Sequence, residues 1–246
     1  MKRFYTFFLL LSCCLSLSAQ QQTPKLLITP LHGDFYIFTT YNLYKGNPVP
    51  ANGMYLVTKA GVVMMDSPWD TTQFQPLLDS INNRHHQKVV ICIATHSHAD
   101  KTAGLGYYTS QGIRTYTTIQ TDSICRVKGE KRARYLLAKD TTFNVGGYTF
   151  TTFYPGQGHT PDNIVAWFAR DKVLYGGCLV KSTEATNLGN LQDANPGAWA
   201  ATIRRIQGKF GKPAYVIPGH DGWTSNQSLE HTVELVNEFN KNSKQK

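Results

Sequence analysis

The apolar residues of this chain form short continuous runs that alternate with segments of helical periodicity. The run V-V-I-C-I-A-T at 89–95 is almost wholly apolar, which is typical of a strand buried on both faces. Gly146 and Gly147 indicate the turn of a hairpin. The predicted strands cover residues 33–39, 53–66 with a turn at 59–61, 88–95, 113–116, 142–153 as a hairpin, 163–169, 172–176 and 214–218.

Apolar residues three and four positions apart predict helices between and after these strands. Trp199, Ile203 and Ile206 define one helical face. Asn195 followed by Pro196 is typical of an N-cap with proline at the first helical position. The predicted helices lie around 74–81, from about 102, at 119–128, from 196, and from a cap near 225 or 226 towards the C-terminus. This alternation predicts an α/β fold with sheets and helices in layers.

The length of 246 residues allows one large domain or two small ones, and no repeat or linker divides the chain. Residues 1–19 have a basic start, a short apolar stretch and a small residue at the exit, which indicates a signal peptide cleaved after Ala19. Residues 20–246 are then expected to form a single domain in the periplasm. A lipoprotein anchor at Cys13 is the alternative, although it would leave an unusually short leader.

The formal charge of +9 falls to +7 when the leader, with Lys2 and Arg3, is removed. A basic chain can bind nucleic acid or membranes. Its cations are scattered, however, apart from K-G-E-K-R-A-R at 128–134, for which a solvated surface is the simpler interpretation. We therefore expect no nucleic-acid or stable membrane partner, and a monomer. The odd number of remaining cysteines, Cys92, Cys125 and Cys178, excludes a disulfide framework.

Six side chains suit the coordination of zinc, which accepts imidazole, thiolate and carboxylate ligands. The spacing of two residues puts the rings of His96 and His98 on one side of an extended segment, and Asp100 would continue that alternation. Each ligand segment is a short apolar run that ends in a Gly- or Thr-rich turn, which fits a hydrolytic metal site at the ends of core strands. The candidate ligands are His96, His98, Asp100, His159, Cys178 and His220.

The motifs T-H-S-H-A-D, G-H-T-P-D-N, G-G-C-L-V-K and P-G-H-D, in this order, resemble those of the metallo-β-lactamases of subclass B1. The resemblance covers the chain after about residue 30. It implies a four-layer αβ/βα sandwich and two zinc ions per chain. The first zinc would be held by His96, His98 and His159, and the second by Asp100, Cys178 and His220.

Three neighbouring groups are excluded by particular residues. Many thioesterases and lactonases of the same fold, and subclass B3, carry His directly after the Asp, where this chain has Lys101. Subclass B3 also lacks the Cys, and subclass B2 has Asn in place of His96. The usual B1 motif has Arg after the Asp. Lys101 keeps that charge but not the planar fork of Arg, which leaves the support of the second-zinc loop open.

The resemblance implies hydrolysis of the β-lactam amide of penicillins, cephalosporins and carbapenems by a zinc-bound hydroxide that Asp100 orients. Lys181 would bind the substrate carboxylate, and Asn190 would donate to the carbonyl oxygen, with Asn187 as a competitor.

Residues 41–53 would form a flap over the site or a plain connecting loop. Asp66 would support the metal loop. A lactone or thioester hydrolase and a non-catalytic zinc-binding protein are the alternatives. Preference among β-lactam classes depends on pocket width and flap motion.

Overall fold

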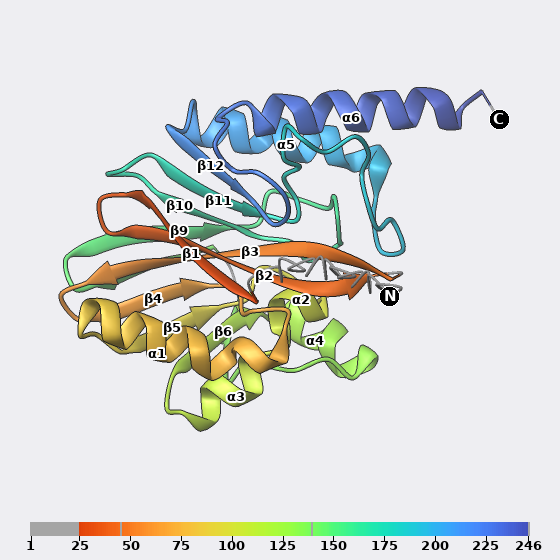
Figure 1. Ribbon diagram of the computed structural model, residues 1–246. Helices are drawn as coiled ribbons and strands as arrows, with labels where there is room; N and C mark the ends of the chain where they lie inside the picture. The colour runs from red at the N-terminus through yellow and green to blue at the C-terminus, as the bar shows by residue number, and fades with distance from the viewer. Residues whose placement is uncertain (1–24, 45, 139, 246) are drawn as a thin grey trace, which may run out of the picture.

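The computed structural model describes residues 25–44, 46–138 and 140–245. Two β-sheets are stacked face to face, and helices cover the outer face of each (Figure 1). The α/β class and the four-layer arrangement are thereby confirmed. The signal peptide, its cleavage after Ala19 and the lipidation alternative at Cys13 lie outside the described residues. None of the described helices has the length and hydropathy needed to span a membrane.

The N-terminal sheet has its strands in chain order from β1 to β7. Neighbours from β1 to β4 pair antiparallel, and those from β4 to β7 pair parallel. Its strands are β1 (Leu26–His32), β2 (Phe35–Tyr44), β3 (Asn47–Thr58), β4 (Gly61–Met65), β5 (Val89–Ile93), β6 (Arg114–Thr118) and β7 (Tyr135–Leu137). The helical elements that follow β4, β5 and β6 are η1 (Thr71–Gln73), α1 (Phe74–His85), α2 (Ala99–Thr102), α3 (Leu105–Ser110) and α4 (Ile119–Lys128).

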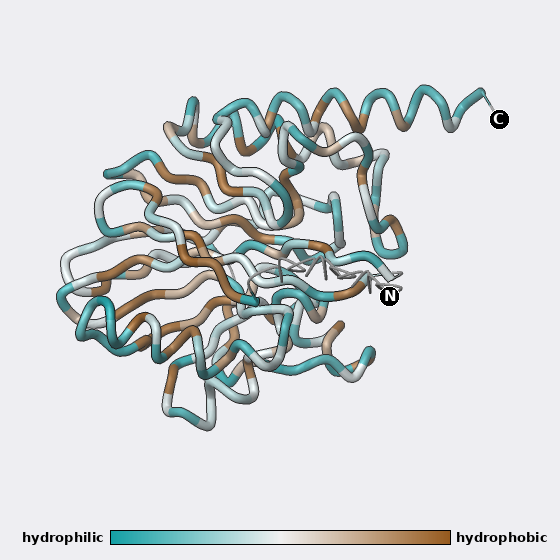
Figure 2. Tube along the Cα trace, in the orientation of Figure 1, coloured by the Kyte–Doolittle hydropathy of each residue, from teal (hydrophilic) through white to brown (hydrophobic). Residues whose placement is uncertain are grey.

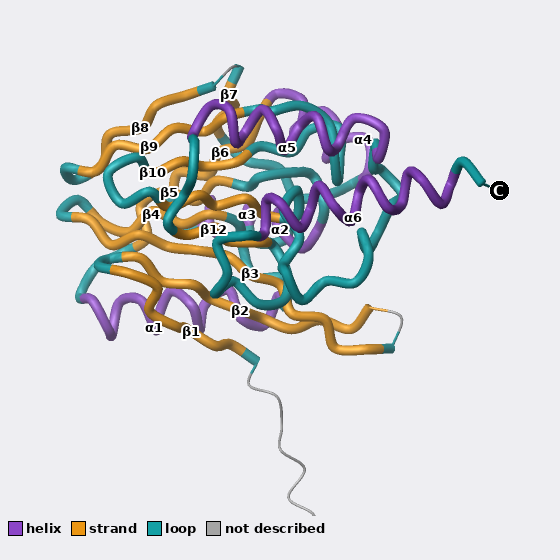
Figure 3. Tube along the Cα trace, turned by 90° about the horizontal axis from the view of Figure 1, so that it is seen from above, coloured by secondary structure: helices purple, strands orange, loops and turns teal. Residues whose placement is uncertain are grey.

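The C-terminal sheet runs in the order β12-β11-β10-β9-β8, with β11 and β12 parallel and the other neighbours antiparallel. Its strands are β8 (Thr141–Val145), β9 (Tyr148–Phe153), β10 (Val165–Phe168), β11 (Val173–Gly177) and β12 (Tyr215–Pro218). Helices α5 (Pro196–Phe210) and α6 (Ser228–Ser243) lie side by side over its outer face (Figures 1 and 3). Asn195 caps α5 as predicted, because its side chain accepts a hydrogen bond from the backbone N–H of Ala198 at 3.2 Å.

Apolar side chains of both sheets form the central core, including Phe35, Met54, Ile93, Phe168 and Tyr175. The brown segments in Figure 2 lie along the strands of both sheets. Burying one such side chain contributes about 1.5–3 kcal/mol, so the core fixes how the two sheets face each other. The core therefore fixes the positions of the strand ends that carry the candidate ligands relative to one another.

The sequence pattern missed the short strand β7 and the N-terminal strand β1. Residues 41–44 and 47–53 also form strand rather than an irregular loop, because β2 and β3 stay paired as far as Tyr44 and Asn47. Pro48 and Pro50 fit there because the pairing of β3 with β4 begins only at Met54. The prolines therefore lie where β3 has a neighbour on one side only, the position at which a strand tolerates proline. The hairpin β2–β3 reaches past the rest of its sheet (Figure 3).

Candidate metal centre

The candidate ligands are carried by loops that leave the ends of core strands. His96 and His98 follow β5, Cys178 directly follows β11, and His220 follows β12. Because β11 and β12 are parallel, their carboxyl ends lie at the same edge of the C-terminal sheet. His159 lies on the loop between β9 and β10. All six side chains come together in two groups.

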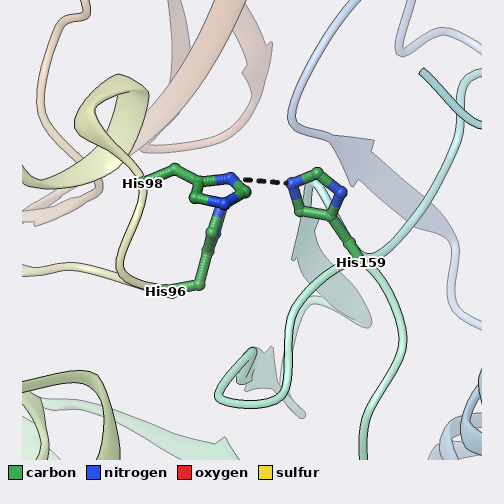
Figure 4. A group of neighbouring side chains, drawn as sticks. All are labelled: His96, His98 and His159. Carbon is green, nitrogen blue, oxygen red and sulfur yellow. Dashed lines mark hydrogen bonds between the residues drawn. The ribbon is translucent and has the colours of Figure 1, made fainter. Parts of the chain in front are cut away.

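The first group consists of His96, His98 and His159, whose rings converge from two segments (Figure 4). Each ring offers one nitrogen, and these nitrogens all lie within 4.8 Å of one another. Nδ1 of His98 is 3.2 Å from Nε2 of His159. The three rings meet edge to face, with centroids 4.8–5.0 Å apart. Three imidazoles around one point are the donor set of a zinc site with an open fourth position.

Burial keeps two of these rings neutral. It lowers the pKa of His96 well below the ordinary histidine value, and it does the same for His159, where Lys181 adds to the effect. Nε2 of His96 is buried and has no hydrogen-bond partner among the described residues. A buried nitrogen without a partner is costly unless it meets a ligand. Neutral rings with this free nitrogen fit a bound cation.

The second group consists of Asp100, Cys178 and His220. Oδ2 of Asp100 is 3.3 Å from Sγ of Cys178 and 3.2 Å from Nε2 of His220, and the last two atoms are 3.2 Å apart. Asp100 does not continue the extended alternation of the two histidines, because α2 begins at Ala99 rather than near 102. The helical turn directs Asp100 away from His98 and His159 and towards Cys178.

The ionisation of this second group depends on burial and on one lysine. Burial raises the pKa of Cys178 well above the ordinary thiol value. Burial also opposes ionisation of Asp100, but Lys101, His220 and His96 together hold its pKa well below the ordinary value. A bound cation would deprotonate the thiol, as coordinating thiols require. The carboxylate, thiol and imidazole therefore fit a second, more negatively charged metal site.

Lys101 supports the second group through its buried ammonium group. Its side chain is fully buried, and its Nζ lies 3.3 Å from Oδ2 of Asp100 and 3.9 Å from Oδ2 of Asp66. It also donates hydrogen bonds to the carbonyl oxygens of Asn52 at 3.1 Å and Gly219 at 3.3 Å. A single ammonium thus reaches four oxygens from different segments. Lys101 therefore supports the loop of the second group even though it replaces the usual Arg, because its ammonium group contacts all four of these oxygens.

Asp66 supports the loop that carries His96, as the sequence suggested. Its carboxylate accepts hydrogen bonds from the backbone N–H of Thr95 at 2.7 Å and from the hydroxyl of Tyr175 at 2.7 Å. Burial nevertheless raises the pKa of Asp66 to about 6, against the attraction of Lys101. The backbone of Asp66 has φ +62°, an uncommon conformation for a residue with a side chain. Such strain is characteristic of functional sites.

The hairpin β2–β3 is tied to the second group. Asn52 donates from Nδ2 to the carbonyl oxygens of Pro218 and Asp221. Nδ1 of His220 donates to the carbonyl oxygen of Pro50 at 2.6 Å, which fixes the tautomer and turns Nε2 towards Cys178. Gly219 lies between Pro218 and His220 in this segment. Only glycine fits at this position, because a Cβ there would lie 2.5 Å from Sγ of Cys178.

Asp193 is a supporting residue that the sequence analysis missed. Its Oδ2 accepts a hydrogen bond from Nε2 of His98 at 2.7 Å, and Nζ of Lys128 lies 2.5 Å from the same oxygen. The contact fixes His98 with Nδ1 facing the other two rings. His98 and Asp193 are 95 residues apart, so no local pattern links them.

A cavity of about 780 Å³ opens over both groups. It is lined by Tyr44 and Val49 of the hairpin, by Trp69, and by the loop after Cys178. Lys181, Asn187 and Asn190 all line it, so the structure brings the predicted substrate residues to the candidate ligands. Lys181 lies with Nζ 5.3 Å from the ring centroid of the buried Trp199. Burial lowers the pKa of Lys181.

Asn163 holds the His159 loop, accepting a hydrogen bond from the N–H of Thr160 and donating one to the carbonyl of Gly156. Cys92, Cys125 and Cys178 are free and buried, so the expectation of no disulfide framework holds for them. His85, the last residue of α1, is half-buried, and its Nε2 lies 3.1 Å from the hydroxyl of Tyr55.

Comparison with known proteins gives a consistent result. A family model described as the metallo-beta-lactamase superfamily matches residues 46–220. A metallo-beta-lactamase type 2 of Elizabethkingia meningoseptica is 43% identical over 224 residues, which cover 91% of this chain and 90% of that protein. Metallo-beta-lactamase IND-1 of Chryseobacterium indologenes is 40% identical over 238 residues, covering 96% and 99%. The crystal structure of metallo-beta-lactamase IND-7 matches with a TM-score of 0.84 at 40% identity, covering 88% of this chain and all of that one.

Proposed function

Because this chain belongs to the metallo-β-lactamase superfamily, in subclass B1 of class B, we propose that it hydrolyses the β-lactam amide bond with the help of two zinc ions. His96, His98 and His159 would hold one zinc, and Asp100, Cys178 and His220 the other. Bound zinc supplies Lewis acidity, which makes hydroxide available near neutral pH and polarises a carbonyl. The substrates proposed are penicillins, cephalosporins and carbapenems.

Lys181 is proposed to bind the carboxylate that β-lactam antibiotics share. It lines the cavity three residues beyond Cys178, and its backbone N–H donates to the hydroxyl of Thr232 at 2.8 Å. Its neighbour Trp199 is itself fixed by a hydrogen bond from Nε1 to the carbonyl of Leu179. The ammonium is therefore held at one wall of the cavity, where it can orient an anionic substrate.

Asn190 is proposed to donate to the carbonyl oxygen of the substrate. Its Oδ1 accepts from the backbone N–H of Gln192 at 3.1 Å, and its Nδ2 has no partner among the described residues. The amide of Asn187 is engaged at both ends, accepting from Gly189 and donating to Thr186. The free donor favours Asn190 over Asn187. Asp100, which stays ionised, would orient the attacking water.

The observation that carries this proposal is the convergence of two complete three-ligand groups at the floor of one cavity. The test is hydrolysis of a chromogenic cephalosporin by the purified protein, with and without a chelator, beside a lactone and a thioester. We expect cephalosporin turnover that chelation abolishes and added zinc restores. Turnover of the lactone or thioester alone would identify a different hydrolase, and no turnover of any substrate would favour a non-catalytic zinc-binding protein.

We further propose that residues 1–19 direct export and that the mature chain acts as a monomer in the periplasm. The supports are the leader pattern and the periplasmic site of β-lactam action. Cell fractionation followed by N-terminal sequencing tests this, with the mature chain expected to begin at Gln20.

A further inference from the structure

Exposed apolar side chains gather at one part of the surface. Among the described residues, eight large apolar side chains are exposed, and five of them lie in or beside α4 and β7. Isolated exposed apolar residues are ordinary, but a group of this kind marks an interaction site. The five are Ile119 at 50% exposure, Val127 at 84%, Tyr135 at 41%, Leu136 at 46% and Tyr154 at 38%.

These side chains lie in neighbouring segments at the edge of the sheet formed by β7, which we call the α4–β7 surface and define as residues 119–136 with Tyr154. Helix α4 begins directly after β6, and β7 pairs with β6, so that Leu137 lies opposite Thr118. Ile119, Leu137 and Tyr154 border one cavity of about 750 Å³. Ile119 and Val127 are eight residues apart, which places them on the same face of α4. Figure 1 shows α4 at the edge of its helical layer, away from α5 and α6.

The same surface is strongly basic. Residues 119–136 contain five cations, Arg126, Lys128, Lys131, Arg132 and Arg134, against two anions, Asp122 and Glu130. Arg132 pairs with Asp122, and Lys128 pairs with Asp193. The other three cations are exposed and form no ion pair within the described part of the chain. Exposed cations thus alternate with exposed apolar side chains.

We propose that the α4–β7 surface docks reversibly on an anionic lipid bilayer. Cations beside an anionic leaflet are attracted to its headgroups, and adjacent apolar side chains enter the interfacial region. A solvated surface, our expectation from the basic run alone, explains the cations but not the five exposed apolar residues among them. The docking is peripheral and reversible, so it differs from a stable membrane anchor.

The test is co-sedimentation of the mature protein with phosphatidylcholine vesicles, with and without an equal amount of phosphatidylglycerol, at low salt and at 0.5 M salt. The key variant is Lys131→Glu with Arg134→Glu. Its matched control is Lys59→Glu with Lys88→Glu, which makes the same charge change at exposed lysines outside the α4–β7 surface. Lys128 is left intact because it contacts Asp193. Thermal unfolding followed by circular dichroism checks that each variant is folded.

We expect wild-type protein to bind only the anionic vesicles and to be released by salt. Partition should fall about fivefold for each cation removed, hence at least about 25-fold in Lys131→Glu with Arg134→Glu, and much less in the control. Val127→Ser should lower partition about tenfold, and Leu27→Ser, at another exposed apolar residue, should not. Equal losses in both charge variants, or no wild-type binding at low salt, would overturn the proposal. Binding to DNA that is lost in Lys131→Glu with Arg134→Glu, without any binding to vesicles, would also overturn it.

Discussion

The two ligand groups share one cavity but are supported in different ways. The first group has neutral imidazoles and is steadied by Asp193 and Lys128, whose side chains are 22% and 35% exposed. The second group is anionic and rests on Lys101, which is entirely buried and lies beside Asp66, the buried carboxylate that also supports the His96 loop of the first group. A buried ion pair is destabilising to break, whereas a partly exposed one is weak. The comparison indicates that the second group is built into the folded core, whereas in the first group His98 is oriented by partly exposed residues.

Removing the buried cation should have the largest effect. Lys101→Met leaves Asp66, Asp100 and the segment at Gly219 without their shared donor. We expect the metal-free protein to lose about 3–5 kcal/mol of unfolding free energy, measured by urea denaturation. Lys101→Arg keeps the charge and serves as the control, with a smaller loss. A loss below about 1 kcal/mol in Lys101→Met would show that the buried network is not a structural support.

Exchange of single ligands should separate the two groups. Cys178→Ser replaces a soft thiolate by a poor neutral ligand, so zinc affinity of the second site should fall by more than about 100-fold while the first site is kept. His98→Ala should instead weaken the first site. Zinc titration of both variants checks this, and loss of the same metal in both would contradict the division of the ligands.

Lys181 forms no hydrogen bond or ion pair with either metal group in the described part of the chain, so its replacement should mainly affect substrate binding. Lys181→Ala should lower kcat/KM about 10- to 100-fold for anionic β-lactams, mainly through KM, since a charge-assisted hydrogen bond contributes about 1.5–3 kcal/mol. Lys181→Glu should lower it further by repulsion. Zinc content should not change. Kinetics equal to wild type for several β-lactams would leave Lys181 as an ordinary surface residue.

Asp193 should give the smallest effect, because its contacts are partly exposed. Asp193→Asn keeps the shape but weakens the hold on Nε2 of His98, and should lower zinc affinity of the first site about tenfold. The second site should be unaffected, and stability should change by less than about 1 kcal/mol. Competition with a chelating dye measures both affinities. An equal loss at the second site would show that the two supports are not separate.

Local sequence patterns and the family motifs were sufficient to predict most helices and the six candidate ligands. The helical period placed α1, α4 and α5, and the motifs named all the side chains that the structure brings together. Apart from Asp66, the supporting residues could not be predicted, because their roles depend on contacts between distant segments. Asp193 is 95 residues from His98, and Asn52 is 166 residues from Pro218. The hairpin end at 41–53 was missed because only the pairing of β2 with β3 makes its prolines compatible with strand.

The central claim is that one cavity contains two chemically different metal sites. Titration of the metal-free protein with cobalt(II) tests it most directly, because only coordination by Cys178 produces thiolate-to-metal charge transfer. The account predicts that two equivalents bind per chain and that only one of the two binding steps produces the charge-transfer band. Saturation of all absorption changes by a single equivalent would contradict it.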